Sequence, residues 1–446
     1  MLLCVDVGTS SVKAGVIGPR GELVSWSREG LLFDTDRPKP YDLARRWLEA
    51  IQSVVARLNG IESIDGVAIS GNGPTIVPVN EDGPSGPVLL WLDEKQIKIA
   101  GNPSFFLPKI VWFKEHHRHA YDQTRWFISC PEYVSYELTG TAVTITPNDE
   151  FKPFIWTDDS VRAYDLDPDR LPPFVGLGDL IGTVSKNASV KYGIPADIPV
   201  LAGGSDFLMS LLGTATVRPG RTCDRAGTSE GINHCSAKPA ALTRLRVLPH
   251  VIPGLFNVAG ILASTGRIFE WFRRISGQQH KSYDRMLRDI ESTPDEVDAP
   301  FFLPSLHNGE TWEFAGAAFM NLEPYHGVND MGRAVIESIA FSIRDLVETL
   351  ERNDCAVSEL RVSGGQARNH AWNQMKADMI GRDVVVPQII DAELLGSAIV
   401  GYVGTGVLGN LVDASDTLYS EARRYKSSPT KRYEENYSRY CEGESP

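Results

Sequence analysis

The tripeptide Gly-Thr-Ser occurs twice in the chain, at residues 8–10 and 227–229, each time between extended segments. The first copy follows the apolar run Leu2 to Val7, which predicts a strand, a turn and a second strand. Apolar residues recur at spacings of three and four from Tyr41 to Leu58 and predict a helix with one buried face. Strands that alternate with crossover helices indicate an α/β fold. Because both halves carry the same turn, we expect two related α/β domains that face each other across a cleft.

The length of the chain supports the same division. At 446 residues the chain exceeds what one hydrophobic core usually holds. Small residues from Ala202 to Ser205 precede the expected crossing between domains, and we place the first domain at residues 1–207 and the second at 208–446. A composition of 42% hydrophobic and 23% charged residues is typical of a fully folded globular protein.

Charge and hydropathy limit the function classes. The formal net charge of −13 argues against a nucleic-acid or membrane-surface partner, because both depend on basic patches. No apolar run is long enough for a membrane span, and Met1 leads into Leu2 without a secretory signal pattern. We therefore expect a cytoplasmic protein, and a homodimer, the commonest symmetric assembly, is compatible with the sequence. The six cysteines lack metal-ligand spacing and are expected to be reduced thiols.

The first turn has the residue types that bind phosphate. Backbone N–H groups and hydroxyls at residues 8–11 converge on one point, and Lys13 adds a positive charge. Asp6 ends a buried strand, where a free carboxylate is costly, so we expect it to face a cation such as Mg²⁺ bound to nucleotide phosphates. The alternative is an ordinary hairpin in which the Asp caps the turn.

Two further segments favour phosphate binding. Gly227-Thr228-Ser229 repeats the first turn, and Gly364-Gly365 joins a predicted strand to a helix that starts near Asn369. Paired glycines permit close approach of a ligand, and a helix N-terminus favours negative charge. The alternative is a strand-to-helix connection whose glycines serve packing alone.

Asp206 is the candidate general base. It follows Gly203-Gly204-Ser205 and precedes an apolar helical segment, so its carboxylate emerges at a strand end near the expected domain crossing. Phosphoryl transfer requires positioning, charge stabilisation and a carboxylate that accepts the hydroxyl proton. The alternative role is that of a helix N-cap.

Taken together, these residues resemble the carbohydrate kinases that include glycerol, xylulose, ribulose, gluconate and fuculose kinases, which have the ribonuclease-H-like, actin-like ATPase fold. The resemblance runs in the family's order from residue 1 to about residue 405. It is carried by Asp6-x-Gly8-Thr9-Ser10-x-x-Lys13, Trp91-x-Asp93, Gly203-Gly204-Ser205-Asp206, Gly227-Thr228-Ser229, Gly266, Ser363-Gly364-Gly365-x-Ala367-x-Asn369 and Gly396-x-Ala398.

The resemblance implies a role for each of these positions. It implies that Asp206 is the catalytic base and that Asp6 organises Mg²⁺. The residues that it implies for ATP binding are Gly8, Thr9, Ser10, Lys13, Gly227, Thr228, Gly266, Gly364, Gly365 and Asn369. The residues expected to contact the substrate are Asn72, Gly73, Pro74 and Asp206.

The departures from the family pattern lie at positions expected to be near the substrate. Xylulose kinases usually carry Ser-Gly-Gln-Met-His-Gly where this chain has Ser70 to Thr75, and glycerol kinases carry Arg-Glu near Gly73 and Pro74. The expected Asp-x-Ser-x-Ala segment is replaced by residues 146–151. We therefore expect an ATP-dependent kinase of a small sugar or polyol, with a ketopentose such as xylulose or ribulose as the first candidate.

Two rival functions remain compatible with the sequence. An ATPase of the same fold would hydrolyse ATP without a sugar. A sugar-binding pseudokinase would keep the fold without turnover, although the presence of Asp6 and Asp206 argues against this reading.

Overall fold

The computed structural model describes residues 1–31, 42–91, 93, 95–97, 101–227, 229–240, 244–293, 299–304, 314 and 316–443. The chain forms two compact units. Unit 1 comprises Met1–Gly213, Val251–Pro253 and Glu393–Leu418, and unit 2 comprises Thr214–His250, Gly254–Ala392 and Tyr419–Pro446.

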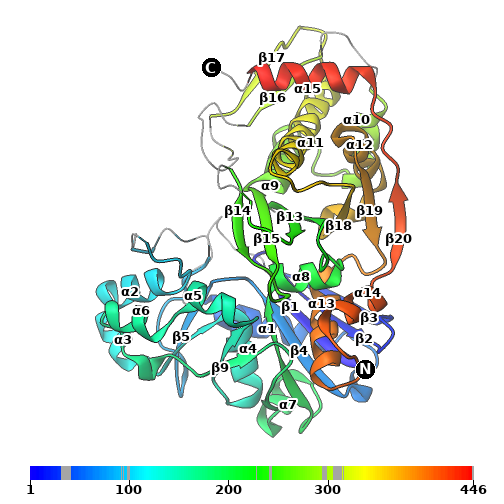
Figure 1. Ribbon diagram of the computed structural model, residues 1–446. Coiled ribbons are helices and arrows are strands. Elements are labelled where there is room, and N and C mark those ends of the chain that lie inside the picture. The colour runs from blue at the N-terminus through cyan, green and yellow to red at the C-terminus, as the bar shows by residue number, and fades with distance from the viewer. Residues whose placement is uncertain are drawn as a thin grey trace. The chain divides into compact units, whose positions relative to one another are not determined.

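This division differs from the expected boundary at residues 207 and 208 in two places. Helix α8 (Asp206–Gly213) belongs to unit 1 because it continues from strand β11 (Pro199–Ser205) and packs against it. The late segment Glu393–Leu418, with most of α13 (Ala392–Gly404) and all of α14 (Leu411–Leu418), also belongs to unit 1. In Figure 1 these orange helices lie beside the blue strands from the start of the chain.

A close backbone approach explains why the late segment packs there. A Cβ atom added to Gly396 of α13 would lie 2.0 Å from the carbonyl oxygen of Met209 in α8, so a larger residue would separate the two helices. A Cβ on Gly401 would lie 2.6 Å from a methyl group of Leu2 in the first strand. The absence of side chains at Gly396 and Gly401 thus allows α13 to pack closely against unit 1.

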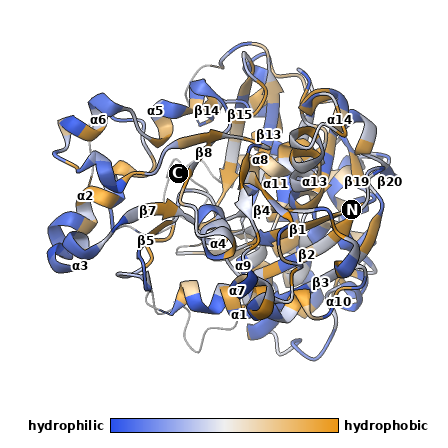
Figure 2. Ribbon diagram, turned by 90° about the horizontal axis from the view of Figure 1, so that it is seen from below, coloured by the Kyte–Doolittle hydropathy of each residue, from blue (hydrophilic) through white to orange (hydrophobic). Residues whose placement is uncertain are grey.

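Unit 1 is built on a six-stranded sheet. The strand order is β10-β11-β4-β1-β2-β3, in which β1, β4 and β11 are parallel and their outer neighbours are antiparallel. The bounds of these strands are β1 (Leu2–Val7), β2 (Ser11–Ile17), β3 (Leu23–Gly30), β4 (Gly66–Gly71), β10 (Leu180–Thr183) and β11 (Pro199–Ser205). Every residue of β1 and β4 is buried, and Figure 2 shows hydrophobic residues along β1.

Helices cover this sheet. The helix predicted from residue 41 to 58 spans Leu43–Val55 as α1 and packs its apolar side, with Trp47 at 1% exposure, against β2 and β3. Helix α4 (Cys130–Thr139) packs against β4, β10 and β11, and α7 (Lys186–Tyr192) contacts both α1 and α4.

The rest of unit 1 consists of smaller elements. Strands β5, β6 and β7 form an antiparallel sheet, and β8 and β9 form a parallel pair. The bounds are β5 (Ile76–Asn80), β6 (Gly83–Pro84), β7 (Trp126–Ser129), β8 (Thr144–Thr146), β9 (Phe174–Gly176), α2 (Leu107–His116), α3 (Arg118–Gln123), α5 (Lys152–Ile155) and α6 (Asp158–Ala163).

Unit 2 is built on a seven-stranded sheet. The strand order is β14-β15-β13-β12-β18-β19-β20, in which β12, β18 and β19 are parallel. The bounds are β12 (Thr222–Ala226), β13 (Glu230–Ser236), β14 (Arg246–Pro249), β15 (Phe256–Leu262), β18 (Glu359–Ser363), β19 (Asp383–Pro387) and β20 (Glu421–Tyr425); β16 (Phe301–Leu303) and β17 (Ala318–Met320) form a separate pair.

Six strands have the same spatial order and relative direction in the two sheets, and unit 2 adds β14 at one edge. In unit 1 an antiparallel meander, β1-β2-β3, is followed by the parallel strands β4 and β11 and by antiparallel β10. In unit 2 the meander β12-β13-β15 is followed by parallel β18 and β19 and by antiparallel β20. The prediction of two related α/β halves is therefore confirmed.

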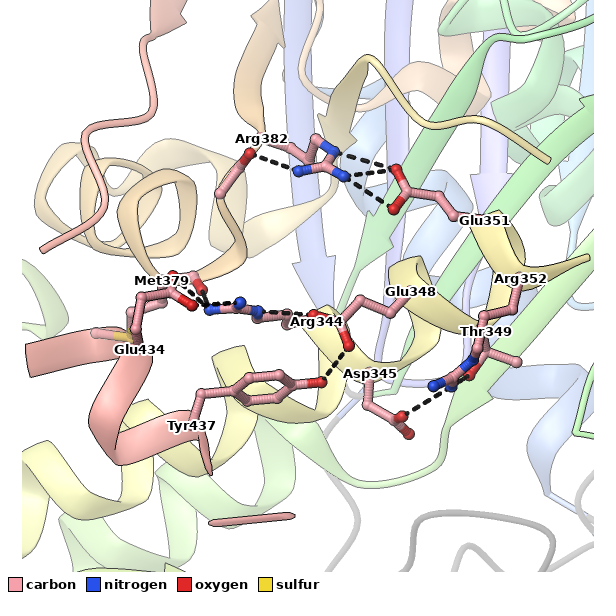
Figure 3. Close-up of polar contacts among 11 residues, drawn as sticks. Arg344, Asp345, Glu348, Thr349, Glu351, Arg352, Met379, Arg382, Glu434 and Tyr437 are labelled. Atoms are coloured by element: carbon pink, nitrogen blue, oxygen red, sulfur yellow. Dashed lines mark hydrogen bonds and ion pairs between the residues drawn. The ribbon is translucent and has the colours of Figure 1, made fainter. Parts of the chain in front are cut away.

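Helices α9 (Thr265–Ile275), α10 (Tyr283–Glu291), α11 (Val328–Arg352), α12 (His370–Ile380) and α15 (Lys431–Gly443) complete unit 2. Arg344 of α11 holds α15 in place (Figure 3): its guanidinium contacts Glu434 at 2.7 Å and Glu348 at 2.9 Å. The same guanidinium lies 4.1 Å from the ring centre of Tyr437 in α15, so charge and ring packing act together.

None of the six cysteines, all of which lie in the described residues, forms a disulfide bond, and all except Cys441 are buried. Among the residues that the structure describes, no helix combines the length and hydropathy needed to cross a membrane.

Candidate active site

Three parallel strands of unit 1 end at the same edge of the sheet. Val7 of β1 pairs in register with Gly71 of β4, and Gly71 pairs with Ser205 of β11. Neighbouring strands lie about 4.8 Å apart, so the residues after these three ends are close together. These residues are Gly8, Asn72 and Asp206. The carboxyl edge of parallel strands is where open α/β sheets bind ligands.

Asp6 lies buried behind this edge, with 2% of its surface exposed. Its Oδ1 accepts a hydrogen bond from the Ser70 hydroxyl at 2.8 Å, and its Oδ2 lies 3.7 Å from the Lys13 ammonium. Burial, together with the charges of Glu393 and Asp206, raises the pKa of Asp6 to about 7, although the charge of Lys13 acts to lower it. Binding of a further positive charge would stabilise the ionised form of such a buried carboxyl group.

Lys13 lies between two carboxylates. Antiparallel pairing of β1 and β2 places it opposite Asp6, and its ammonium is 3.8 Å from Oε2 of Glu393 at the start of α13. This Glu393 oxygen is buried and accepts no hydrogen bond from the residues that the structure describes. Sequence reasoning missed Glu393, because 380 positions separate it from Lys13 and no motif marks it.

The first Gly-Thr-Ser turn is tight and exposed. The Gly8 N–H donates to the Ser11 carbonyl at 3.0 Å, which closes the turn, and the side chains of Thr9 and Ser10 are on the surface. The Trp91 indole N–H points to the Thr9 hydroxyl at 3.4 Å. The turn therefore presents hydroxyl groups outward, as a phosphate-binding turn requires.

Asp206 is the first residue of α8 and is half-buried. Its Oδ1 accepts a hydrogen bond from the N–H of the next residue, Phe207, at 2.7 Å. This bond is compatible with a catalytic role, because a carboxylate has several acceptor positions.

The three predicted substrate contacts next to Asp206 differ in accessibility. Asn72 is buried, and its side-chain amide donates to the Val7 carbonyl at 2.7 Å and accepts from the Thr75 hydroxyl at 3.2 Å. The bond to Val7 joins the ends of β4 and β1. Gly73 and Pro74 are half-buried, so they are better placed than Asn72 for contact with a ligand.

The predicted nucleotide-binding residues of unit 2 also lie along one sheet edge. The strands that precede Gly227, Gly364 and Gly266 run in the same direction, and Gly266 lies in the first turn of α9. Gly364 has a φ of +88°, and a Cβ there would lie 2.5 Å from the Ala226 carbonyl oxygen, so glycine is required. Thr228 lies outside the described residues.

The Gly364–Asn369 connection leads into a capped helix. Gly365 has no atom within 4 Å of a Cβ position, and the Gln366 side chain donates to the Gly227 carbonyl at 3.0 Å. Asn369 caps α12, because its side-chain oxygen accepts the Trp372 N–H at 2.9 Å. The structure thus brings the predicted Gly227 and Gly364–Gly365 segments together.

A buried ion cluster supports this part of unit 2 and was missed in the sequence. The Lys376 ammonium lies 2.6 Å from Asp224 and 2.5 Å from Glu230, and all three side chains are completely buried. Burial and the charge of Glu230 raise the pKa of Asp224 well above its usual range. The charges of Asp224 and Glu230 raise the pKa of Lys376 although burial lowers it. Two carboxyls of the β12–β13 hairpin share one ammonium.

Comparisons with known proteins agree with this arrangement. Residues 97–213 match the N-terminal domain of the FGGY family of carbohydrate kinases, and residues 225–405 match the C-terminal domain of the same family. The chain belongs to the FGGY family of carbohydrate kinases. It is therefore a sugar phosphotransferase, and ATP is the phosphoryl donor that this family implies.

Individual relatives are distant. The xylulose kinase of Bacillus subtilis (strain 168) is 23% identical over 98% of this chain and 95% of its own length. The structure of xylulose kinase from Rhodospirillum rubrum superimposes with a TM-score of 0.77 at 21% identity, covering 99% of this chain and 97% of that one. The structure of gluconate kinase from Lactobacillus acidophilus gives a TM-score of 0.80 at 18% identity, covering 99% and 96%. The last two comparisons show the fold and leave the substrate open.

Proposed function

We propose that the chain transfers the γ-phosphoryl group of ATP to a hydroxyl of a small sugar or polyol, with a ketopentose of the xylulose or ribulose type as the first candidate. The observation that carries the proposal is the shared register of β1, β4 and β11, which puts the Gly8 turn and Asp206 at one edge of the unit 1 sheet. The choice of a ketopentose is supported by the xylulose kinase relatives.

In the proposed reaction, Asp206 accepts the proton of the attacking hydroxyl. That oxygen bonds to the γ-phosphorus while the bond from phosphorus to the bridging oxygen of ADP breaks. The backbone and hydroxyls at Gly8 to Ser10 face the phosphate, and Lys13 offsets its charge. In unit 2 we assign nucleotide binding to Gly227, Thr228, Gly266, Gly364, Gly365 and Asn369.

Asp6 fits a Mg²⁺ ion bound to the nucleotide. Within the described part of the chain, no group of three or more His, Cys, Asp or Glu side chains could hold a metal ion. Mg²⁺ usually needs only one or two carboxylates plus substrate phosphates, and the buried Asp6 supplies one. When bound, the ion would neutralise phosphate charge. The chain's own part is to hold the Asp6 carboxylate through Ser70 and Lys13.

The test is a coupled assay of ADP release with Mg²⁺-ATP and a panel of ketoses, polyols and sugar acids. Asp206→Asn keeps the shape of the side chain but removes the base, and turnover should fall by about 10²-fold or more. Asp158→Asn is the matched control, because Asp158 also opens a helix but is exposed and away from the strand ends. Sugar-independent ATP hydrolysis that survives in Asp206→Asn would instead favour an ATPase.

A further inference from the structure

A hollow of about 370 Å³ opens in unit 1 beside the strand that leads to Asp206. We call it the β8–β9 hollow. Ligand pockets typically measure about 300–1,000 Å³, so this one suits a single small sugar. Its lining residues are Thr146, Pro147, Asn148, Asp149, Lys152, Phe174, Val175, Gly176 and Asp179.

Backbone contacts join the hollow to β11. The Gly178 N–H donates to the Ala202 carbonyl, and the Ala202 N–H donates to the Asp179 carbonyl, both at 2.8 Å. Two residues further along, a Cβ on Gly204 would lie 3.3 Å from a methyl group of Leu177, which lies in the chain between the lining residues Gly176 and Asp179. The wall of the hollow therefore follows β11 to within two residues of Asp206, a rise of about 7 Å.

The parallel pairing of β8 and β9 orients the hollow. Thr146 and Gly176 are paired at the carboxyl ends of these strands. The remaining lining residues follow these ends, except Phe174 and Val175, which lie within β9. This part of the lining is also the segment, residues 146–151, that departs from the family pattern. A sugar whose reacting hydroxyl lies at Asp206 can extend its remaining carbons toward this wall.

The lining is polar and carries more negative than positive charge. Asp149 pairs with Lys152 at 2.7 Å, and the Lys152 ammonium lies 5.6 Å from the centre of the Phe174 ring. Asp179 adds a second carboxylate, whose Oδ2 accepts the Gly176 N–H at 2.7 Å. The lining therefore contains two carboxylates and one ammonium. Carboxylate oxygens accept hydrogen bonds from sugar hydroxyls, whereas they repel an anionic group.

We propose that the β8–β9 hollow receives the end of the acceptor remote from the reacting hydroxyl and selects uncharged polyhydroxy compounds over sugar acids. This inference rests on the proposed kinase function and gives it a substrate class. One unpaired carboxylate several ångströms from an acceptor carboxylate should discriminate by about tenfold at low salt.

The experiment compares kcat/KM for D-xylulose, D-ribulose and D-gluconate at low ionic strength. The wild-type protein should favour a neutral ketose over gluconate by about tenfold or more. Asp179→Asn, which keeps the acceptor oxygen for Gly176, and Asp149→Lys should each raise the gluconate-to-ketose ratio by about tenfold. The KM for ATP should remain within about twofold, because the phosphate turn is untouched.

Asp158→Lys is the matched control, since it reverses an exposed charge on α6 outside the hollow. A wild-type preference for gluconate, or ratios in the two hollow variants that equal the ratio in Asp158→Lys, would overturn the inference while leaving the kinase function intact.

Calorimetric titration of D-xylulose and D-gluconate without ATP separates the inference from the proposed function. If no acceptor is phosphorylated, the kinase proposal fails. Xylulose binding that weakens in a Phe174→Ala variant still supports the hollow as a neutral-sugar site. If neither compound binds, or if gluconate binds more tightly than xylulose, the hollow does not have this role.

Discussion

Replacing Lys376 by Met should destabilise unit 2 strongly. The ammonium lies 2.6 Å from Asp224 and 2.5 Å from Glu230, and none of the three side chains is exposed. The substitution leaves two buried carboxyls without a cation, and removal of one partner from a buried ion pair typically costs about 3–5 kcal/mol. For a unit of about 200 residues, this loss lowers the melting temperature by roughly 10 °C.

The assay is urea denaturation followed by circular dichroism, with calorimetry for the melting temperature. A matched control is Lys431→Met, because Lys431 forms an ion pair with Glu435 at 3.0 Å on the exposed surface of α15. This pair should contribute less than about 0.5 kcal/mol. Adding Glu230→Gln to Lys376→Met should restore part of the loss, because one buried acid is then removed.

A loss below about 1 kcal/mol in Lys376→Met, or an equal loss in Lys431→Met, would refute the reasoning. Either result would mean that burial of the three charges does not determine the stability of this part of unit 2.

Three further predictions follow from buried or clustered charges. Burial lowers the pKa of His250 to about 4. The contribution of the neutral imidazole to the free energy of unfolding is therefore complete above about pH 6.5 and is lost as the pH falls toward 4. His250→Gln should flatten this acid dependence of the free energy of unfolding, which amounts to up to about 3 kcal/mol in denaturation curves. Arg344→Ala should cost about 1–3 kcal/mol and expose α15 to proteolysis, whereas Arg344→Lys, which keeps the charge, should cost less. Glu393→Gln should lower kcat/KM severalfold in the wild type but have little further effect in Lys13→Met, because Glu393 acts through Lys13; equal effects in both backgrounds would contradict this coupling.

Much of the fold follows from local sequence. The repeated Gly-Thr-Ser turn predicts two related halves, and the topologies of the two sheets confirm this. The apolar spacing from Tyr41 to Leu58 predicts α1, which the structure places at Leu43–Val55. These features are predictable because turn residues and periodicity act over a few positions.

The position of α13 was not predictable in this way. Its apolar spacing identifies a helix, but it does not reveal which sheet the helix covers. That choice depends on the fit of Gly396 against Met209 and of Gly401 against Leu2. Such close approaches depend on atoms that lie far away in the sequence.

Part of the candidate site was predictable from local sequence. The prediction was incomplete where residues far apart in the sequence come together. Asp6 and Asp206 stand next to glycine-rich turns at strand ends, so their residue types and context identify them. Glu393 reaches Lys13 only through the return of α13 to unit 1. The β8–β9 hollow joins segments nearly thirty residues apart, and its charge balance appears only when Asp149 and Asp179 are brought together.

The return of Glu393–Leu418 to unit 1 has a consequence for synthesis on the ribosome. The strands of the unit 1 sheet emerge early, but the helix that packs Gly401 against Leu2 emerges only after nearly all of unit 2. Domains that are continuous in sequence can fold one after another as they emerge. Unit 1 instead cannot complete the packing of Leu2 against α13 until this late segment has emerged, so its sheet reaches its final packing only near the end of translation.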